Sequence, residues 1–310
     1  MRVIFFGMEC QFSRPPLAAL LRPDSPVEVC AVVVPPPAYL SGARGPGGLP
    51  PIRTLMPPAR PARGLALPTA PARQGIIGLA RAAGVPVFEA GRLANDETIA
   101  VLGAPRPDLF VVACFPRLLP PTLLRLPCLG ALNVHPSLLP AYRGPSPLFW
   151  VFHDGLERAG VTVHLMDAGA DTGDIVAQAR LALLDGVSYA GAERLCAEAG
   201  GRLVVAAARA LGEGGVTARP QSATGVSYAP APHGDDFVVT PDWPARRAFN
   251  FIRGVANLGY PLVLQAGAER LTVREAIAFD ETGAMSAPVE RIGDRARLRC
   301  SPGVLICDIV

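Results

Sequence analysis

Two short segments concentrate the residue types that could do chemistry. The first runs from Asn133 to Gly144 (NVHPSLLPAYRG), and the second runs from Asp167 to Asp174 (DAGADTGD). Side chains two residues apart in an extended chain lie on one face, so Asn133 and His135 should point the same way. Three acids and two glycines in eight residues are typical of a tight loop that presents carboxylates. An amide, an imidazole and a carboxylate can together donate hydrogen bonds and move protons.

Each of these features also has an ordinary structural explanation. A histidine at a strand end is often a hydrogen-bonded structural residue, and aspartate–glycine loops are often simple turns. The other histidines are assigned that structural or exposed role: His153, His164 and His233. A metal site is disfavoured because one histidine with one or two carboxylates is sparse for zinc. We therefore expect no bound metal.

The elements around both segments are expected to alternate between buried strands and helices. Apolar runs predict strands over 2–6, 27–34, 85–88, 108–114, 131–134, 161–166 and 175–183. Helices are expected over 17–21, 76–83, 93–102 and 187–211. This alternation predicts an α/β fold with a doubly wound parallel sheet. Asn133 and His135 then lie at the carboxyl end of a strand, where open α/β sheets place ligands.

The chain is expected to divide into three parts. Residues 1–211 form the α/β domain that holds both segments, and residues 212–234 contain the Gly, Pro and Ser typical of a linker. Residues 235–310 form a small β-rich domain, an OB-like barrel or half-barrel. That domain is expected to open with a helix over 245–255 and to continue as strands over 261–265, 271–276, 296–300 and 304–310.

The composition excludes several mechanisms. The chain has 34 prolines and no lysine, so all 29 basic residues are arginines. Without lysine there can be no lysine Schiff base, no lysine-bound pyridoxal phosphate and no Walker-type phosphate loop. The first turn, GMECQF over 7–12, lacks the G-x-G-x-x-G glycines that let a backbone approach a pyrophosphate. A dinucleotide-dependent dehydrogenase is therefore disfavoured.

The seven cysteines and the apolar pattern bear on the compartment. The cysteines form no C-x-x-C pair, and their odd number argues against a full disulfide framework. They are expected to be reduced thiols that mostly fill the core. The chain lacks a run of about 18 apolar residues, and its short apolar start is not typical of a signal peptide. We therefore expect no membrane association and a cytoplasmic location.

The two segments also carry a family resemblance. The string NVHPSLLPAYRG, followed by GVTVHLMDAGADTGDI from Gly160, resembles the folate-dependent formyltransferases. Phe12 and Ser13 after the first strand and FPRLLP over 115–120 are similar as well. The likeness covers roughly residues 1–206. It implies a Rossmann-like formyltransferase fold, 10-formyltetrahydrofolate as formyl donor, and no metal.

The resemblance also implies a role for each site residue. The amine acceptor attacks the formyl carbon, and Asn133 and a protonated His135 would donate hydrogen bonds to its oxygen. Asp171 would favour the imidazolium and accept the amine proton. The positions implied to bind the donor or shape its site are Arg117, Leu118, Leu119, Ser137, Leu138, Leu139, Pro140, Asp167, Ala168, Gly169 and Ala170.

The resemblance favours initiator methionyl-tRNA as the amine acceptor, as in a methionyl-tRNA formyltransferase, and a small amine such as an amino sugar or amino acid is the alternative. Residues 35–75 are dense in proline, which disfavours helix and central strand, so they are expected to form a long loop. This loop carries five arginines and no acid, which would suit RNA phosphates unless the segment is a disordered insertion. Residues 235–310 argue the other way, since nine arginines stand against ten acids. Hydrolysis of the donor by water and a non-catalytic binding protein are the remaining alternatives.

Overall fold

The computed structural model describes residues 1–37, 50–57 and 75–310. The chain separates into two compact units. The first unit comprises 1–143, 160–179 and 194–226, and the second comprises 144–159, 180–193 and 227–310. The domain limits expected at 211 and 234 stay a prediction. Within the described ranges, no helix is both long and apolar enough to span a bilayer.

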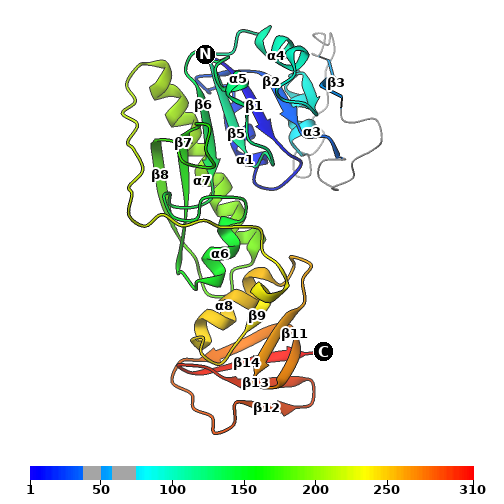
Figure 1. Cartoon of the computed structure of the whole chain (residues 1–310), viewed down its shortest axis with the longest axis vertical. Coiled ribbons are helices and arrows are strands. Elements are labelled where there is room, and N and C mark those ends of the chain that lie inside the picture. The colour runs from blue at the N-terminus through cyan, green and yellow to red at the C-terminus, as the bar shows by residue number, and fades with distance from the viewer. Residues whose placement is uncertain (38–49, 58–74) are drawn as a thin grey trace. The chain divides into compact units, whose positions relative to one another are not determined.

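An eight-stranded sheet forms the frame of the first unit, with the described strands in the order β3-β4-β2-β1-β5-β6-β7-β8 (Figure 1). The strands are β1 (Arg2–Gly7), β2 (Glu28–Val34), β3 (Ile52–Met56), β4 (Val87–Ala90), β5 (Leu109–Ala113), β6 (Ala131–His135), β7 (Arg158–Leu165) and β8 (Ile175–Ala182). Neighbouring strands from β4 to β6 pair in parallel, whereas β3 with β4 and β6 with β7 are antiparallel. The predicted α/β class with a mainly parallel sheet is confirmed.

Helices connect most of these strands. They are α1 (Arg14–Leu20), α3 (Ile76–Ala82), α4 (Asp96–Gly103), α5 (Pro121–Leu124), α6 (Pro147–His153) and α7 (Tyr189–Gly212). The strands of the parallel part are buried almost throughout, because helices cover parallel sheets on both faces. A core cluster joins Ile4 and Phe6 of β1 to Phe110 and Val112 of β5. This core fixes the strand ends on which the candidate site stands.

The segment 35–75 departs from the expectation that its prolines block strands. Residues 38–49 and 58–74 lie outside the described residues, but Ile52–Met56 forms β3. β3 is the last described strand of its sheet and pairs antiparallel with β4. A strand at an edge tolerates flanking prolines because one side of it needs no ladder hydrogen bonds. Arg53 of β3 is held by the buried Glu89, with Nε 2.8 Å from Oε1.

A glycine of α7 sets how closely that helix approaches β6. A Cβ on Gly200 would lie 2.5 Å from Cγ1 of Val134 and 3.2 Å from Cγ2 of Val161. Val134 stands between Asn133 and His135, so this close approach supports the strand that carries both polar side chains. Gly212, the last residue of the same helix, has much more room, since a Cβ there would lie 3.7 Å from its nearest neighbour, Sδ of Met1.

We predict that Gly200→Ala lowers the free energy of unfolding by about 1–3 kcal/mol, because the added methyl group overpacks the contact with Val134. Gly212→Ala is the matched control and should be neutral or stabilising by up to about 1 kcal/mol, since alanine favours the helix. Urea unfolding of the two variants tests this difference. Equal stabilities would show that the helix moves away from β6 at no cost.

The second unit is built on a six-stranded sheet with described strands in the order β12-β13-β14-β11-β10-β9. The elements are the 3₁₀ helix η2 (Gly234–Phe237), β9 (Val238–Val239), α8 (Ala245–Val255), β10 (Leu262–Ala266), β11 (Glu269–Asp280), β12 (Val289–Ile292), β13 (Arg295–Arg299) and β14 (Val304–Ile309). Phe149 and Phe152 of α6 pack in its core with Phe237 and Phe251. The expected small, mostly-β C-terminal part with one helix is confirmed.

Candidate functional site

The three predicted catalytic side chains meet at the carboxylate of Asp171. Asn133 Nδ2 donates a hydrogen bond to Asp171 Oδ1 at 3.0 Å. Asp171 Oδ2 lies 3.6 Å from His135 Nδ1. Asn133 and His135 occupy the end of β6, as the spacing predicted, and Asp171 reaches them from the loop between β7 and β8. The Asp171 side chain is 15% exposed, so the cluster is reachable from solvent.

His164 joins this cluster although its position on a strand predicted only a structural role. It stands opposite Asn133 in the antiparallel pair β6–β7, and directly opposed residues share a face. Its Nδ1 lies 2.8 Å from the carbonyl oxygen of Leu165, which can only accept, so Nδ1 donates. Nε2 lies 3.2 Å from Asn133 Nδ2, which can only donate, so Nε2 accepts. Asn133 therefore donates one amide hydrogen to His164 and the other to Asp171.

His135 is buried, with only 4% of its surface exposed. Its Nε2 lies 2.8 Å from the carbonyl oxygen of Tyr142 and donates to it. Burial lowers the pKa of His135, while the charge of Asp171 and the Tyr142 carbonyl raise it; burial prevails. The ring is thus neutral at neutral pH, whereas the resemblance implied a protonated ring. The free-energy cost of desolvating a charged imidazole at this buried position exceeds the stabilisation that the Asp171 carboxylate provides.

Acidification should destabilise the chain through His135. Because its folded-state pKa lies below the ordinary value of 6.5, the unfolded chain binds more protons between the two values. Stability is therefore present above pH 6.5 and falls as the pH drops, with a slope of up to about 1.4 kcal/mol per pH unit. Urea unfolding measured across this range should show that His135→Gln flattens the slope. His233→Gln, at a side chain that is 75% exposed, should leave it in place.

The loop after β6 is anchored by polar contacts to β7 and β8. Thr162 Oγ1 donates to the carbonyl of Ser137 at 2.7 Å and accepts from the backbone N–H of Leu139 at 3.1 Å. Gln178 Nε2 donates to the Leu139 carbonyl at 2.8 Å. Ser137 Oγ closes the loop by donating to the Ala141 carbonyl at 2.7 Å. These contacts fix the segment 137–140, and the predicted role of that segment in shaping the donor site stays a prediction.

The loop over 167–174, here called the acid loop, contains a strained backbone conformation. Asp171 has a φ of 56°, in the left-handed region that non-glycine residues rarely adopt. Asp167 Oδ1 braces the loop by accepting from Gly169 N at 3.0 Å and from Thr172 Oγ1 at 2.6 Å. Tyr142, whose carbonyl oxygen accepts the hydrogen bond from His135, also has a positive φ, of 60°. Strained residues that persist in a fold cluster at functional sites, which fits both positions.

Gln221 holds the acid loop from a segment that was predicted to be a linker. Its Nε2 donates to the carbonyl oxygens of Asp171 at 2.7 Å and Gly173 at 2.8 Å. Its Oε1 accepts from Arg143, at 2.7 Å from Nη2 and 3.1 Å from Nε. The amide thus ties the strained loop to the end of the segment that follows β6.

Both His164 and Gln221 were missed as site residues. His164 lies shortly before the acid loop in the sequence, yet only the pairing register with β6 reveals its contact with Asn133. Gln221 lies 50 residues after Asp171, and its surroundings in the sequence contain no further polar pattern. The one signal that the sequence offered for His164 was a histidine within a buried strand.

The remaining residues predicted to bind the donor lie on two exposed segments. Leu118 is 62% exposed, while the neighbouring Leu119 is buried. Arg117 Nη1 donates to the carbonyl of Gly91 at 2.8 Å, which fastens this segment to the turn after β4. Ala168 and Gly169 are also exposed. The predicted role of these residues in binding the donor stays a prediction. Among the described residues, no three His, Cys, Asp or Glu side chains form a metal-binding group.

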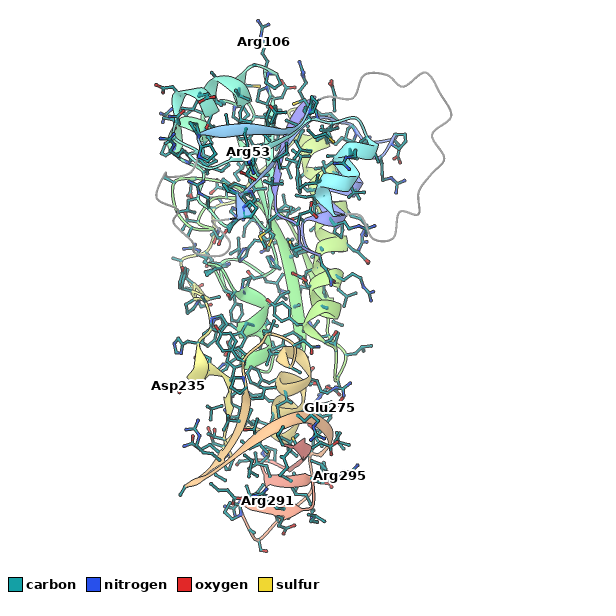
Figure 2. All side chains as sticks on the ribbon, turned by 90° about the vertical axis from the view of Figure 1, so that its right-hand side faces the viewer. Arg53, Arg106, Asp235, Glu275, Arg291 and Arg295 are labelled. Atoms are coloured by element: carbon teal, nitrogen blue, oxygen red, sulfur yellow. The ribbon has the colours of Figure 1, made fainter. Side chains whose placement is uncertain are left out.

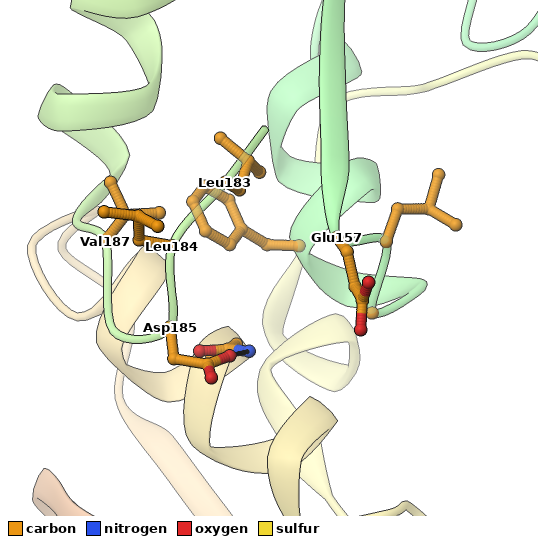
Figure 3. Close-up of a pocket in the computed structure, with 9 residues that line it drawn as sticks. Glu157, Leu183, Leu184, Asp185 and Val187 are labelled. Carbon is orange, nitrogen blue, oxygen red and sulfur yellow. Dashed lines mark hydrogen bonds between the residues drawn. The ribbon is translucent and has the colours of Figure 1, made fainter. Parts of the chain in front are cut away.

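A separate pocket lies in the second unit, lined by Phe152, Gly155, Leu156, Glu157, Leu183, Leu184, Asp185, Val187 and Asn250 (Figure 3). Two acids that line the pocket, Glu157 and Asp185, are both paired with the nearby Arg246. Arg246 Nε donates to Asp185 Oδ1 at 2.9 Å, and Nη1 donates to Glu157 Oε1 at 2.5 Å. The Arg246 hydrogen bond lowers the pKa of Asp185. None of the predicted site residues lines this pocket.

A mainly parallel α/β sheet whose edge gathers an amide, two imidazoles and a carboxylate is a candidate catalytic centre of an α/β protein. A family model described as formyl transferase matches residues 1–207. The methionyl-tRNA formyltransferase of Synechococcus sp. (strain JA-3-3Ab) is 38% identical over 256 residues, which cover 82% of this chain and 71% of that protein. The methionyl-tRNA formyltransferase of Pelobacter propionicus is 30% identical over 306 residues, covering 98% and 86%. The chain belongs to the formyltransferase family, as its motifs implied.

Solved structures share the fold of the chain. An N-formyltransferase from Helicobacter canadensis, in complex with folinic acid and dTDP-3-aminofucose, has a TM-score of 0.63 at 14% identity and covers 100% of this chain and 99% of its own. The methionyl-tRNA formyltransferase of Clostridium thermocellum has a TM-score of 0.53 at 14% identity, covering 90% and 93%. At these identities the likeness establishes the fold alone.

Proposed function

We propose that this chain transfers the formyl group of 10-formyltetrahydrofolate to the amino group of methionyl-tRNA, with Asn133, His135 and Asp171 as catalytic residues. The observation that carries the proposal is the meeting of Asn133, His135 and His164 at the carboxylate of Asp171. The methionyl-tRNA formyltransferases named above support the acceptor, since their similarity extends over as much as 98% of this chain.

Asn133 and Asp171 have different roles in the reaction: Asn133 stabilises the developing negative charge, and Asp171 accepts a proton. When bound, the donor supplies the formyl carbon that the amine attacks, and the carbon's bond to the carrier nitrogen breaks. The amide hydrogen that Asn133 gives to Asp171 in the structure is donated instead to the formyl oxygen as negative charge develops there, and one such donor is typically worth about 10²–10³ in rate. Asp171 accepts the proton that the amine loses, directly or through a water, and the carrier nitrogen leaves with a proton returned in the same way.

His135 starts the reaction as a neutral ring. Its Nε2–H is donated to Tyr142, so a formyl oxygen would take the place of that carbonyl as acceptor. Negative charge on the oxygen, added to that of Asp171, favours the imidazolium and offsets the effect of burial. His135 therefore responds to the charge that the reaction creates.

His164 and Gln221 act as positioning residues. His164 Nε2 accepts one amide hydrogen of Asn133 and so fixes which way that amide faces. Gln221 holds the backbone of Asp171 in its left-handed conformation. Neither side chain needs to touch a substrate to support the catalytic cluster.

A small amine is the second candidate acceptor, and the charges of the second unit favour it. Arg295 Nε lies 3.2 Å from Asp308, Arg297 Nη1 lies 3.0 Å from Glu290, and Arg253 pairs with Glu275. Figure 2 labels Arg295 and Glu275 among these residues. Arginines already paired with acids contribute less to a phosphate-binding surface.

The acceptor is tested by giving the purified chain 10-formyltetrahydrofolate with methionyl-tRNA, with an amino-sugar nucleotide, or with neither. We expect formyl transfer to methionyl-tRNA, weakening steeply as salt rises because phosphate contacts release counterions. Formylation of the amino sugar alone would move the assignment to the small-amine class. Formate release without an acceptor would indicate hydrolysis of the donor.

A further inference from the structure

Two cysteines follow neighbouring parallel strands of the first unit. β1 and β5 pair in parallel, and their last residues, Gly7 and Ala113, are register partners. Cys114 comes directly after Ala113, and Cys10 lies in the turn after Gly7. Because the carboxyl ends of parallel strands meet at one edge of a sheet, the two thiols share the edge that also carries the end of β6.

Ser13 fixes Cys10 to the end of β5. Ser13 Oγ donates to the carbonyl oxygen of Ala113 at 2.7 Å and lies 3.4 Å from Cys10 Sγ. The backbone N–H of Ser13 also donates to Cys10 Sγ, at 3.4 Å. The side chain of Cys114 completes the arrangement with a hydrogen bond to Cys10. These contacts place the side chains of Cys10 and Cys114 next to each other at the ends of β1 and β5.

Both thiols are accessible, and the pKa of Cys10 is lowered. Cys114 is exposed and Cys10 is partly exposed. The hydrogen bond from Cys114 lowers the pKa of Cys10 to about 6, with further help from Ser13 and against the effect of burial. By contrast, burial raises the pKa of Cys300 to about 11. Thiolate character and exposure together decide which cysteine reacts with an oxidant.

We propose that Cys10 and Cys114 form a redox-active thiol pair that hydroperoxides oxidise to a disulfide. The Cys10 thiolate attacks one peroxide oxygen, the O–O bond breaks, and protonation of the leaving oxygen releases water or an alcohol and leaves a sulfenic acid. The sulfur of Cys114 then attacks the sulfenic sulfur, the S–S bond forms and a second water leaves with the Cys114 proton. The two thiols lose two electrons, which the peroxide gains.

This site adjoins the predicted donor-binding residues. Cys114 immediately precedes the segment that carries Arg117 and Leu118, and Ala113 is the register partner of Val134, between Asn133 and His135. Cys114 also has a φ of 54°, so the backbone at this point is already constrained. A bond from Cys114 to Cys10 would restrain that segment further. Resting on the proposed function, we expect oxidation to weaken donor binding reversibly.

The covalent step is tested first, without any activity assay. Wild-type chain is treated with hydrogen peroxide, denatured, alkylated, digested and examined by mass spectrometry. We expect a Cys10–Cys114 linked peptide that a thiol reductant abolishes. Cys128→Ser, which removes another exposed cysteine, should keep the linkage. Absence of the linked peptide, or linkage of Cys10 to a different cysteine, would overturn the proposal.

The order of events is tested with Cys114→Ser. This variant should stop at a Cys10 sulfenic acid, trapped by dimedone, whereas Cys10→Ser should give neither the trap at position 10 nor the linkage. At about pH 6, Cys10 should be alkylated roughly tenfold faster than free N-acetylcysteine, because its larger thiolate fraction outweighs its lower nucleophilicity. Alkylation no faster than that of N-acetylcysteine would contradict the activation of Cys10.

The effect on the donor is measured separately. Oxidised wild type should bind 10-formyltetrahydrofolate at least several-fold more weakly than the reduced chain, and the reductant should restore binding. Oxidised Cys128→Ser should behave as wild type. A linked peptide with unchanged donor affinity would keep the thiol pair but reject its effect on binding. If reduced wild type fails to bind the donor at all, it is the proposed function that fails.

Discussion

Replacing Asp171 by asparagine should lower kcat for formyl transfer by about 10²–10⁴-fold, the range that a positioned proton acceptor contributes. Asparagine keeps the size of the side chain but cannot accept the amine proton. Its amide also removes the charge that stands 3.6 Å from His135 Nδ1 and 3.4 Å from His164 Nε2. The lost charge would leave the neutral His135 with no carboxylate to stabilise its imidazolium as the reaction proceeds.

Asp174→Asn is the matched control for Asp171→Asn, because it makes the same change in charge within the same loop. Its kcat should stay within about twofold of wild type, as expected for a partly exposed surface change. Steady-state kinetics and urea unfolding of both variants separate catalysis from stability. A kcat of Asp171→Asn close to that of wild type, in a folded chain, would remove Asp171 from the mechanism.

Replacing Asn133 by alanine should lower kcat by about 10²–10³-fold and change the KM for the donor much less, because a donor to the developing oxyanion acts mainly in the transition state. The structure explains why one amide matters so much. Both of its hydrogens are directed, at 3.0 Å from Asp171 Oδ1 and 3.2 Å from His164 Nε2, so the group is oriented before any substrate arrives.

Asn95→Ala provides the control for Asn133→Ala. Asn95 caps α4 by accepting from the backbone N–H of Glu97 at 3.0 Å, so its loss should cost about 1 kcal/mol of stability. Its kcat should be unchanged. If Asn133→Ala raises the KM and leaves kcat intact, Asn133 binds the ground state only, and its assignment as an oxyanion donor is wrong.

The motif residues were predictable because their relation is local. Asn133 and His135 share a face by the two-residue period of a strand, and the apolar run before them requires a buried strand. The position of that strand's carboxyl end then follows from the α/β alternation. Local patterns do not determine the structure of the segment 50–57. Its prolines favoured a loop, yet β3 forms there because an edge position relaxes the demand for hydrogen bonds.

The amino-acid sequence by itself determined the α/β class, the family and the pair of polar side chains on β6, since these depend on short-range periodicity and on contiguous motifs. Only the tertiary structure decided that His164 faces Asn133 and that Gln221 donates a hydrogen bond to the carbonyl of Asp171. It also decided that burial keeps His135 neutral. The physical reason is that strand register, contacts between distant segments and dehydration arise only when the whole chain packs.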